Sequence, residues 1–162
     1  MFVESCSLKG LGEFADMPEG NILYRKTFEI QGGDFDKAGS VSTEIKSILK
    51  GVGIDSNIIR SVAIATFEAE MNVVIHADDG ELEFILTPED ICIDVHDHGK
   101  GIENIELAMQ EGYSTATDEM REMGFGAGMG LPNIKKNSDT FDLTSEVGKG
   151  TRLKITIRHK KN

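Results

Sequence analysis

Three polar side chains recur at intervals of four residues within a segment that is otherwise mostly apolar. The segment runs from about Asp55 to Ala77, and the three side chains are Glu68, Asn72 and His76. Residues four positions apart share one face of a helix, so they would form a single polar stripe on a largely buried helix. A carboxylate and a carboxamide one turn apart suit a metal–phosphate site, because the carboxylate can orient or deprotonate a nucleophile while the amide ligates magnesium. The alternative is a stripe that faces water or is satisfied by backbone groups.

A second candidate is a carboxylate at the end of a predicted strand. In residues 91–95 the apolar side chains at every second position share one face, and Asp97 continues that parity. Its carboxylate should therefore point inward with the core residues, where it needs a hydrogen-bond donor. Gly99 and Gly101 follow within two and four residues and allow the backbone to approach a ligand closely. A glycine-rich turn that begins with Asp is the alternative.

A third candidate is a glycine-rich segment that leads into a predicted helix. Gly126, Gly128 and Gly130 alternate with apolar residues, and Pro132 suits the first turn of the helix that follows. Glycines that expose backbone N–H groups before a helix form a natural phosphate cradle, although a flexible linker is also rich in glycine. Residues 110–124, just before, have the polar composition of a mobile loop and are expected to act as a lid.

One further polar residue is expected to face the interior near Asp97. Residues 141–144 and 153–157 are predicted to be paired strands joined through residues 148–151. Thr151 has the inward parity of the apolar residues in the second of these strands. Asp97 and Thr151 could therefore meet around one polar edge of a ligand, and structural capping is the alternative for Thr151.

These candidates must be positioned by an alternation of predicted helices and strands. That alternation predicts a two-layer α/β sandwich, in which a mixed, largely antiparallel sheet is covered by helices on one face and is comparatively open on the other. The strands are expected at 22–30, 82–86, 91–95, 141–144 and 153–157, the covering helices at 33–51, 55–77 and 130–137, and a short helix at 102–109.

Length and composition restrict the class of protein. Residues 22–162 fit one domain, and residues 1–21, which lack any periodicity, are expected to be an irregular N-terminal extension. The chain carries 17 Lys and Arg against 28 Asp and Glu, and its net charge of −11 argues against nucleic acid or an anionic membrane as a partner. It has no apolar run near the ~20 residues of a membrane span and no signal-peptide layout, so we expect a soluble, cytoplasmic protein. Cys6 and Cys92 lack metal-ligand spacing and are expected to be reduced thiols.

Four motifs, taken in order, resemble the ATP-binding domain (the GHKL or Bergerat fold) that histidine kinases, gyrase, Hsp90 and the bacterial anti-sigma kinases share. The resemblance covers roughly residues 22–158. The small size is similar to the anti-sigma-factor serine/threonine kinases, and residues 112–115 with 126–132 resemble the switch kinase of the bacterial stress-signalling complex. The motifs are Glu68-x-x-x-Asn72, Asp97-x-Gly99-x-Gly101, Gly126-x-Gly128-x-Gly130-Leu131 and Gly148-x-Gly150-Thr151.

The resemblance implies a role for each matching residue, with ATP and Mg²⁺ as cofactors. Glu68 would be catalytic and orient or deprotonate the attacking hydroxyl, Asn72 would ligate Mg²⁺, and Asp97 would accept from the adenine amino group. Thr151 would support the adenine contact. Gly99 and Gly101 would shape the nucleotide pocket, whereas Gly126, Gly128 and Gly130 would let the lid and helix start wrap the phosphates.

Two functions follow from the resemblance. The first is an ATP- and Mg²⁺-dependent serine/threonine protein kinase that acts as an anti-sigma or switch regulator by phosphorylating a STAS-type (anti-anti-sigma) partner. A sigma factor, a phosphatase or a second copy of the chain are further candidate partners. The second is an ATP-gated protein-binding module without phosphotransfer, which would agree with a lid at 116–123 that is longer and more acidic than in the switch kinases.

Overall fold

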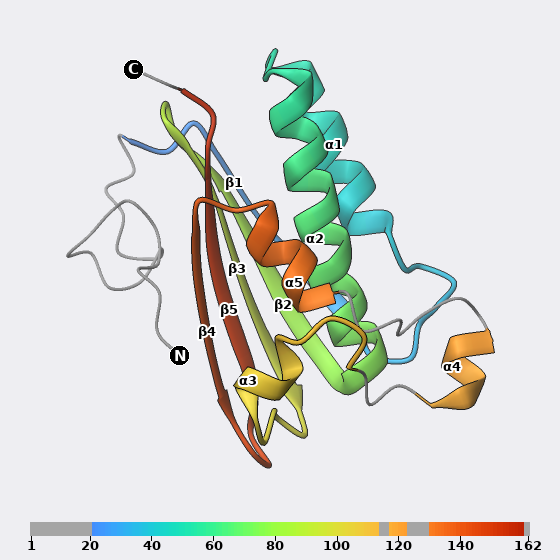
Figure 1. Cartoon of the computed structure of the whole chain (residues 1–162). Helices are drawn as coiled ribbons and strands as arrows, with labels where there is room; N and C mark the ends of the chain where they lie inside the picture. Colours follow the sequence, from blue (N-terminus) through green and yellow to red (C-terminus); the bar gives the residue numbers. More distant parts are fainter. Residues whose placement is uncertain (1–20, 114–116, 123–129, 161–162) are drawn as a thin grey trace.

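The computed structural model describes residues 21–113, 117–122 and 130–160 (Figure 1). Residues 1–20 of the expected N-terminal extension lie outside this range. Among the described residues, no helix combines the length and the apolar composition that a membrane span requires. The elements follow in the order β1 (Tyr24–Gln31), α1 (Ser40–Gly51), α2 (Ser56–His76), β2 (Ala77–Leu86), β3 (Asp90–Gly99), α3 (Ile105–Ala108), α4 (Asp118–Glu122), α5 (Gly130–Lys136), β4 (Thr140–Glu146) and β5 (Gly150–Arg158).

The five strands form one sheet in the order β1-β2-β3-β5-β4, and each of its four described pairs is antiparallel. We expected a mixed sheet, and this detail differs. Strands β3 and β4 do run in the same direction, but β5 lies between them and pairs with both. Strands β1, β3 and β4 run in one direction and β2 and β5 in the other, and each described pair joins one strand of each direction.

Helices α1, α2 and α5 cover one face of this sheet, as predicted (Figure 1). The inward side chains of the strands pack against the helices in a single apolar core. Phe84 and Ile93 of the sheet, and Val62 of α2, are fully buried. The two-layer α/β sandwich predicted from the periodicities is confirmed.

The helix expected at 33–51 begins later than predicted, at Ser40. Residues 32–39 instead form turns that dock on the junction between α2 and β2, where the Gly32 N–H donates to Asp78 O at 2.9 Å and the Gly33 N–H to Val74 O at 2.8 Å. Strand β2 also begins earlier than expected, immediately after α2, and has an irregular register between Ala77 and Gly80. Backbone hydrogen bonds from residues 32–33 therefore hold the α2–β2 junction. These partners are distant in the chain, so the local sequence does not specify them.

The start of α1 depends on a buried carboxylate that the sequence did not reveal. Gly39 at the N-cap provides no side chain to accept from the first N–H groups of the helix. Glu70 on α2 supplies the acceptor and takes hydrogen bonds from the N–H groups of Gly39, Val41 and Ser42 at 3.1, 3.4 and 3.3 Å. Glu70 is only 2% exposed, and this burial raises the pKa of its carboxyl while the three donors act in the opposite direction.

Replacing Glu70 with Ala should therefore lower the free energy of unfolding by at least about 2 kcal/mol, because it leaves buried N–H groups without an acceptor and opens a cavity. Urea denaturation at neutral pH would measure the change. Glu44→Ala is the matched control, because Glu44 lies in the same pair of helices but is exposed, and it forms an ion pair with the exposed Lys26. Equal effects of the two substitutions would contradict the assigned role of Glu70.

Candidate functional site

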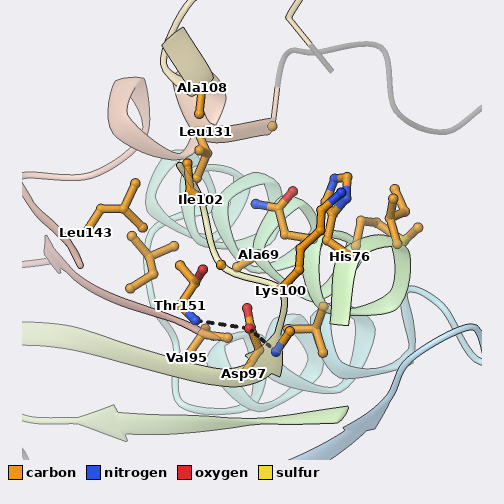
Figure 2. Close-up of a pocket in the computed structure, with 18 of the residues that line it drawn as sticks. Ala69, His76, Val95, Asp97, Lys100, Ile102, Ala108, Leu131, Leu143 and Thr151 are labelled. Carbon is orange, nitrogen blue, oxygen red and sulfur yellow. Dashed lines mark hydrogen bonds between the residues drawn. The ribbon is translucent and has the colours of Figure 1, made fainter. Parts of the chain in front are cut away.

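A cavity of about 600 Å³ lies between α2, the end of β3, the start of β5 and α5 (Figure 2). It is lined on one side by apolar residues, among them Val95, Ile102 and Leu143, and on the other by polar groups. The structure brings together at this cavity seven of the nine residues predicted to form the site, namely Glu68, Asn72, Asp97, Gly99, Gly101, Gly130 and Thr151. The other two, Gly126 and Gly128, lie outside the described residues.

Asp97 joins the end of β3 to the start of β5. Its Oδ1 atom accepts from the Gly99 N–H at 3.0 Å and from the Thr151 N–H at 3.1 Å (Figure 2). Burial raises the pKa of the Asp97 carboxyl, and these two donors act in the opposite direction. Oδ1 is thus committed to the backbone, whereas no described residue donates to Oδ2. The cavity therefore contains an acceptor oxygen that is held in place and is available to a ligand.

Gly99 and Gly101 are required by contacts within the chain, and their predicted role in letting the backbone approach a ligand stays a prediction. A Cβ atom on Gly99 would lie 2.8 Å from His76 O, and one on Gly101 would lie 2.4 Å from Glu146 O. Gly101 also has a φ of +79°, a conformation that disfavours other residues. These glycines shape the cavity by letting the segment after β3 pass close to α2 and to the β4–β5 hairpin.

Thr151 is held by Ser145, a residue that our sequence analysis did not identify. The two hydroxyl oxygens lie 2.9 Å apart, and Ser145 Oγ also accepts from the Ile102 N–H at 2.8 Å. Ser145 therefore links Thr151 to Ile102, which belongs to the apolar wall of the cavity. A signal was present, because Ser145 and Thr151 face each other in the β4–β5 register and a hairpin with its turn at 147–149 would have paired them.

The predicted stripe of Glu68, Asn72 and His76 faces the cavity. Gly130, the first residue of α5, lies against it, because a Cβ atom there would be 3.2 Å from Asn72 Oδ1 and 3.3 Å from Glu68 Oε2. Asn133, a second residue missed by the sequence analysis, donates a side-chain hydrogen bond to Glu68. It follows Gly130 by three positions and so lies on the same side of α5.

Burial dominates the electrostatics of this stripe. It raises the pKa of Glu68, and the hydrogen bond from Asn133 acts in the opposite direction. It lowers the pKa of His76, and the positive charge of Lys100 adds to that effect. His76 and Lys100 lie close together in Figure 2. One end of the cavity therefore carries a carboxylate with a raised pKa, and the His76 end carries a lysine cation beside a histidine that favours its neutral form.

Two predictions about the site remain, namely the magnesium ligand and the lid. Within the described ranges, no group of three or more His, Cys, Asp or Glu residues could hold a metal ion. Asn72 as a magnesium ligand therefore stays a prediction. The lid expected at residues 110–124 contains one helix, α4 (Asp118–Glu122). Residues 114–116 and 123–129 of that region lie outside the described residues.

Comparison with known proteins identifies the class to which this fold and site belong. Residues 40–161 match the family described as histidine kinase-, DNA gyrase B- and HSP90-like ATPases. The chain belongs to this ATPase family, which confirms the resemblance found in its motifs.

Within that family the chain is similar to bacterial anti-sigma regulators. It is 35% identical over 103 residues to an anti-sigma F factor from Caldanaerobacter subterraneus subsp. tengcongensis, an alignment that covers 60% of this chain and 68% of the relative. It is 33% identical over 100 residues to an anti-sigma F factor from Clostridium acetobutylicum, covering 59% and 66%. It is 27% identical over 112 residues to the serine/threonine-protein kinase RsbT from Bacillus subtilis, covering 67% and 78%.

A solved structure supports the fold. The crystal structure of the RsbU and RsbW domains of a Mycobacterium tuberculosis protein superposes with a TM-score of 0.55 at 16% identity. The match covers 85% of this chain and 33% of the solved chain. At this identity the likeness concerns the fold alone.

The raised pKa of Glu68 predicts a specific pH dependence of stability. A carboxyl whose pKa is higher in the folded state than its ordinary value of 4.5 stabilises the fold fully below that pH, and this contribution is lost as the pH rises through the folded pKa. The glutamine of Glu68→Gln cannot ionise, so the variant keeps the stabilisation of an uncharged side chain at every pH. The free energy of unfolding of the variant, minus that of the wild type, should therefore increase as the pH rises from below 4.5 to neutrality.

Denaturant titrations at a series of pH values would measure this difference. Glu81→Gln, at an exposed position on β2, is the matched control. A difference for Glu68→Gln that stays flat or falls with rising pH would show that Glu68 is not held in a desolvated site.

Proposed function

We propose that the chain binds ATP with Mg²⁺ in this cavity and acts as a serine/threonine protein kinase of the anti-sigma or switch type, whose substrate is a STAS-type partner protein. One observation carries the proposal: the acceptor oxygen of Asp97 and the Glu68–Asn72 pair line the same cavity. A purine nucleotide would need the first group at its base and the second at its phosphates. The names of the anti-sigma F factor and RsbT relatives support the proposed class of activity.

The Asp97 end of the cavity suits adenine. Adenine carries an exocyclic amino donor at the position where guanine carries a carbonyl oxygen. Asp97 Oδ2 can accept from that amino group, and Thr151 provides a hydroxyl beside it (Figure 2). The apolar walls formed by Val95, Ile102 and Leu143 suit the faces of a planar base. A guanine carbonyl placed here would face the carboxylate oxygen, so GTP should bind poorly.

The other end suits phosphates and a magnesium ion. Mg²⁺ usually binds through one or two protein groups together with water and substrate phosphates, which fits a site with a single amide oxygen, Asn72 Oδ1, and no carboxylate cage among the described residues. When bound, the ion would neutralise charge on the phosphate oxygens. Lys100 supplies positive charge from the segment after β3. Gly130 permits close approach, because it lies against Asn72 without a side chain.

Glu68 is the proposed catalytic base. It would accept a hydrogen bond or proton from the hydroxyl of the protein substrate, a role that benefits from a pKa closer to neutrality. Burial raises the pKa of Glu68 in that direction. Asn133 holds its carboxylate by a hydrogen bond, which limits the orientations that Glu68 can adopt.

Asp97→Asn should weaken ATP binding by about 1–3 kcal/mol. Both backbone N–H groups need the remaining oxygen at Oδ1, so the new amide nitrogen must replace Oδ2 and would present a donor to the adenine amino group. Calorimetry with ATP and GTP would measure the effect, and Asp78→Asn, at an exposed position on β2, is the control. Equal affinity of the wild type for ATP and GTP would contradict the adenine assignment.

Glu68→Gln should reduce phosphoryl transfer by roughly 10²–10⁴-fold and leave ATP affinity nearly unchanged, because a base contacts the reacting hydroxyl and not the nucleotide. Asn72→Ala should lower Mg²⁺-dependent nucleotide binding and turnover together. Incubation with labelled ATP and candidate STAS proteins, combined with calorimetry, would separate the two effects. If the wild type binds ATP and its partner yet transfers no phosphate, and Glu68→Gln leaves partner binding intact, the ATP-gated binding module replaces the kinase.

A further inference from the structure

Ser145 lies behind the wall of the cavity and not on its surface. It belongs to β4 and faces Thr151 of β5 in the strand register. Thr151 is one of the described residues that line the cavity, whereas Ser145 is not. Any effect of Ser145 on a bound ligand must therefore pass through a neighbouring group.

The hydroxyl of Ser145 has three polar neighbours. Its oxygen accepts from the Ile102 N–H at 2.8 Å. It also lies 2.9 Å from Thr151 Oγ1, where either hydroxyl can be the donor, and 3.1 Å from Gly150 O, which can only accept. A serine hydroxyl has one hydrogen and two lone pairs. The single hydrogen of Ser145 must therefore go either to Thr151 or to Gly150.

This choice decides what Thr151 offers to the cavity. If Ser145 donates to Thr151 Oγ1, the hydrogen of the Thr151 hydroxyl can point at a ligand. If Ser145 donates to Gly150 O instead, Thr151 gives its own hydrogen to Ser145 and offers only lone pairs. The same threonine thus presents a donor in the first arrangement and an acceptor in the second.

Adenine requires the first arrangement. Its amino group has an acceptor ring nitrogen on either side, N1 on one edge of the base and N7 on the other. In the proposed complex Asp97 Oδ2 accepts from the amino group, and Thr151 lies beside Asp97 (Figure 2). Thr151 therefore faces a ring nitrogen and must donate. A bridging water leaves this demand unchanged, because its two hydrogens would go to the ring nitrogen and to the carboxylate.

We propose that Ser145 is a positioning residue for base recognition, which donates to Thr151 and so makes the Thr151 hydroxyl a donor towards the ring nitrogen beside the adenine amino group. This inference rests on the proposed binding of ATP. The cavity then presents an acceptor, Asp97 Oδ2, next to a donor, Thr151 Oγ1. The Ile102 N–H supports this arrangement, because it occupies one lone pair of Ser145 and holds the oxygen in place.

Binding of ATP analogues to the full-length chain tests this role. The analogues 1-deaza-ATP and 7-deaza-ATP each keep the amino group and replace one of the two ring nitrogens with a C–H group. In calorimetry, Ser145→Ala should weaken binding of ATP roughly 3- to 10-fold more than binding of one of these analogues. The reason is that this analogue lacks the acceptor that Thr151 serves, so it gains nothing from an oriented hydroxyl.

Thr144→Ala is the matched control. Thr144 precedes Ser145 on β4, carries the same kind of hydroxyl, and is exposed on the other side of the strand. This substitution should leave the preference of the chain for ATP over both analogues unchanged.

A second variant tests whether the effect passes through Thr151. In a Thr151→Val chain, Ser145→Ala should no longer change the preference for ATP over the responsive analogue, because the last hydroxyl of the relay is missing. The preference compares nucleotides within one variant. A general loss of folding or of affinity lowers the binding of all three nucleotides and therefore cancels.

Two results would overturn the role of Ser145. One is an equal loss for ATP and both analogues, which would make Ser145 a purely structural contact of Ile102 and Gly150. The other is a selective loss that persists in the Thr151→Val chain. Both results leave the proposed function standing. Absence of ATP affinity in the wild type would instead overturn the proposed function, and this inference with it.

Discussion

The pair of hydrogen bonds accepted by Asp97 Oδ1 holds the site together. They join the Gly99 N–H, at the end of β3, to the Thr151 N–H, at the start of β5. Because one oxygen serves both backbone donors, the other is held in a defined position in the cavity. The same contact holds the segment that follows β3 and forms one wall of the cavity. A change in this single interaction would alter both the position of the acceptor and the shape of the space around it.

Two other carboxylates illustrate how burial can serve structure or chemistry. Glu70 and Glu68 lie on the same helix, and burial raises the pKa of both. Glu70 accepts hydrogen bonds from three N–H donors and fixes the start of α1. Glu68 receives a hydrogen bond from Asn133 and faces the cavity. The difference between a structural and a candidate catalytic carboxylate therefore lies in how many of the lone pairs the fold itself occupies.

The two faces of the sheet have different demands. The helix-covered face is an apolar core whose packing requires no further partner. On the opposite face of the sheet, Cys92 and Thr156 are also buried.

The sequence by itself determined which residues face the same side of one element. The interval of four placed Glu68 and Asn72 on one face of a helix, and the alternation of strand residues placed Asp97 and Thr151 inward; the cavity contains all four. These results depend only on helical and strand periodicity, which are local. The order of the glycine motifs also indicated the family, which the comparison with known proteins confirmed.

Only the tertiary structure decided which elements meet. The insertion of β5 between β3 and β4 made every described strand pair antiparallel, and it placed Ser145 beside Thr151. Packing of α5 on α2 brought Asn133 to Glu68, and packing of α2 on α1 brought Glu70 to the helix start at Ser40. Periodicity states which side of its own element a residue faces, but the partner across that side is set by strand order and helix packing between segments that are distant in the chain.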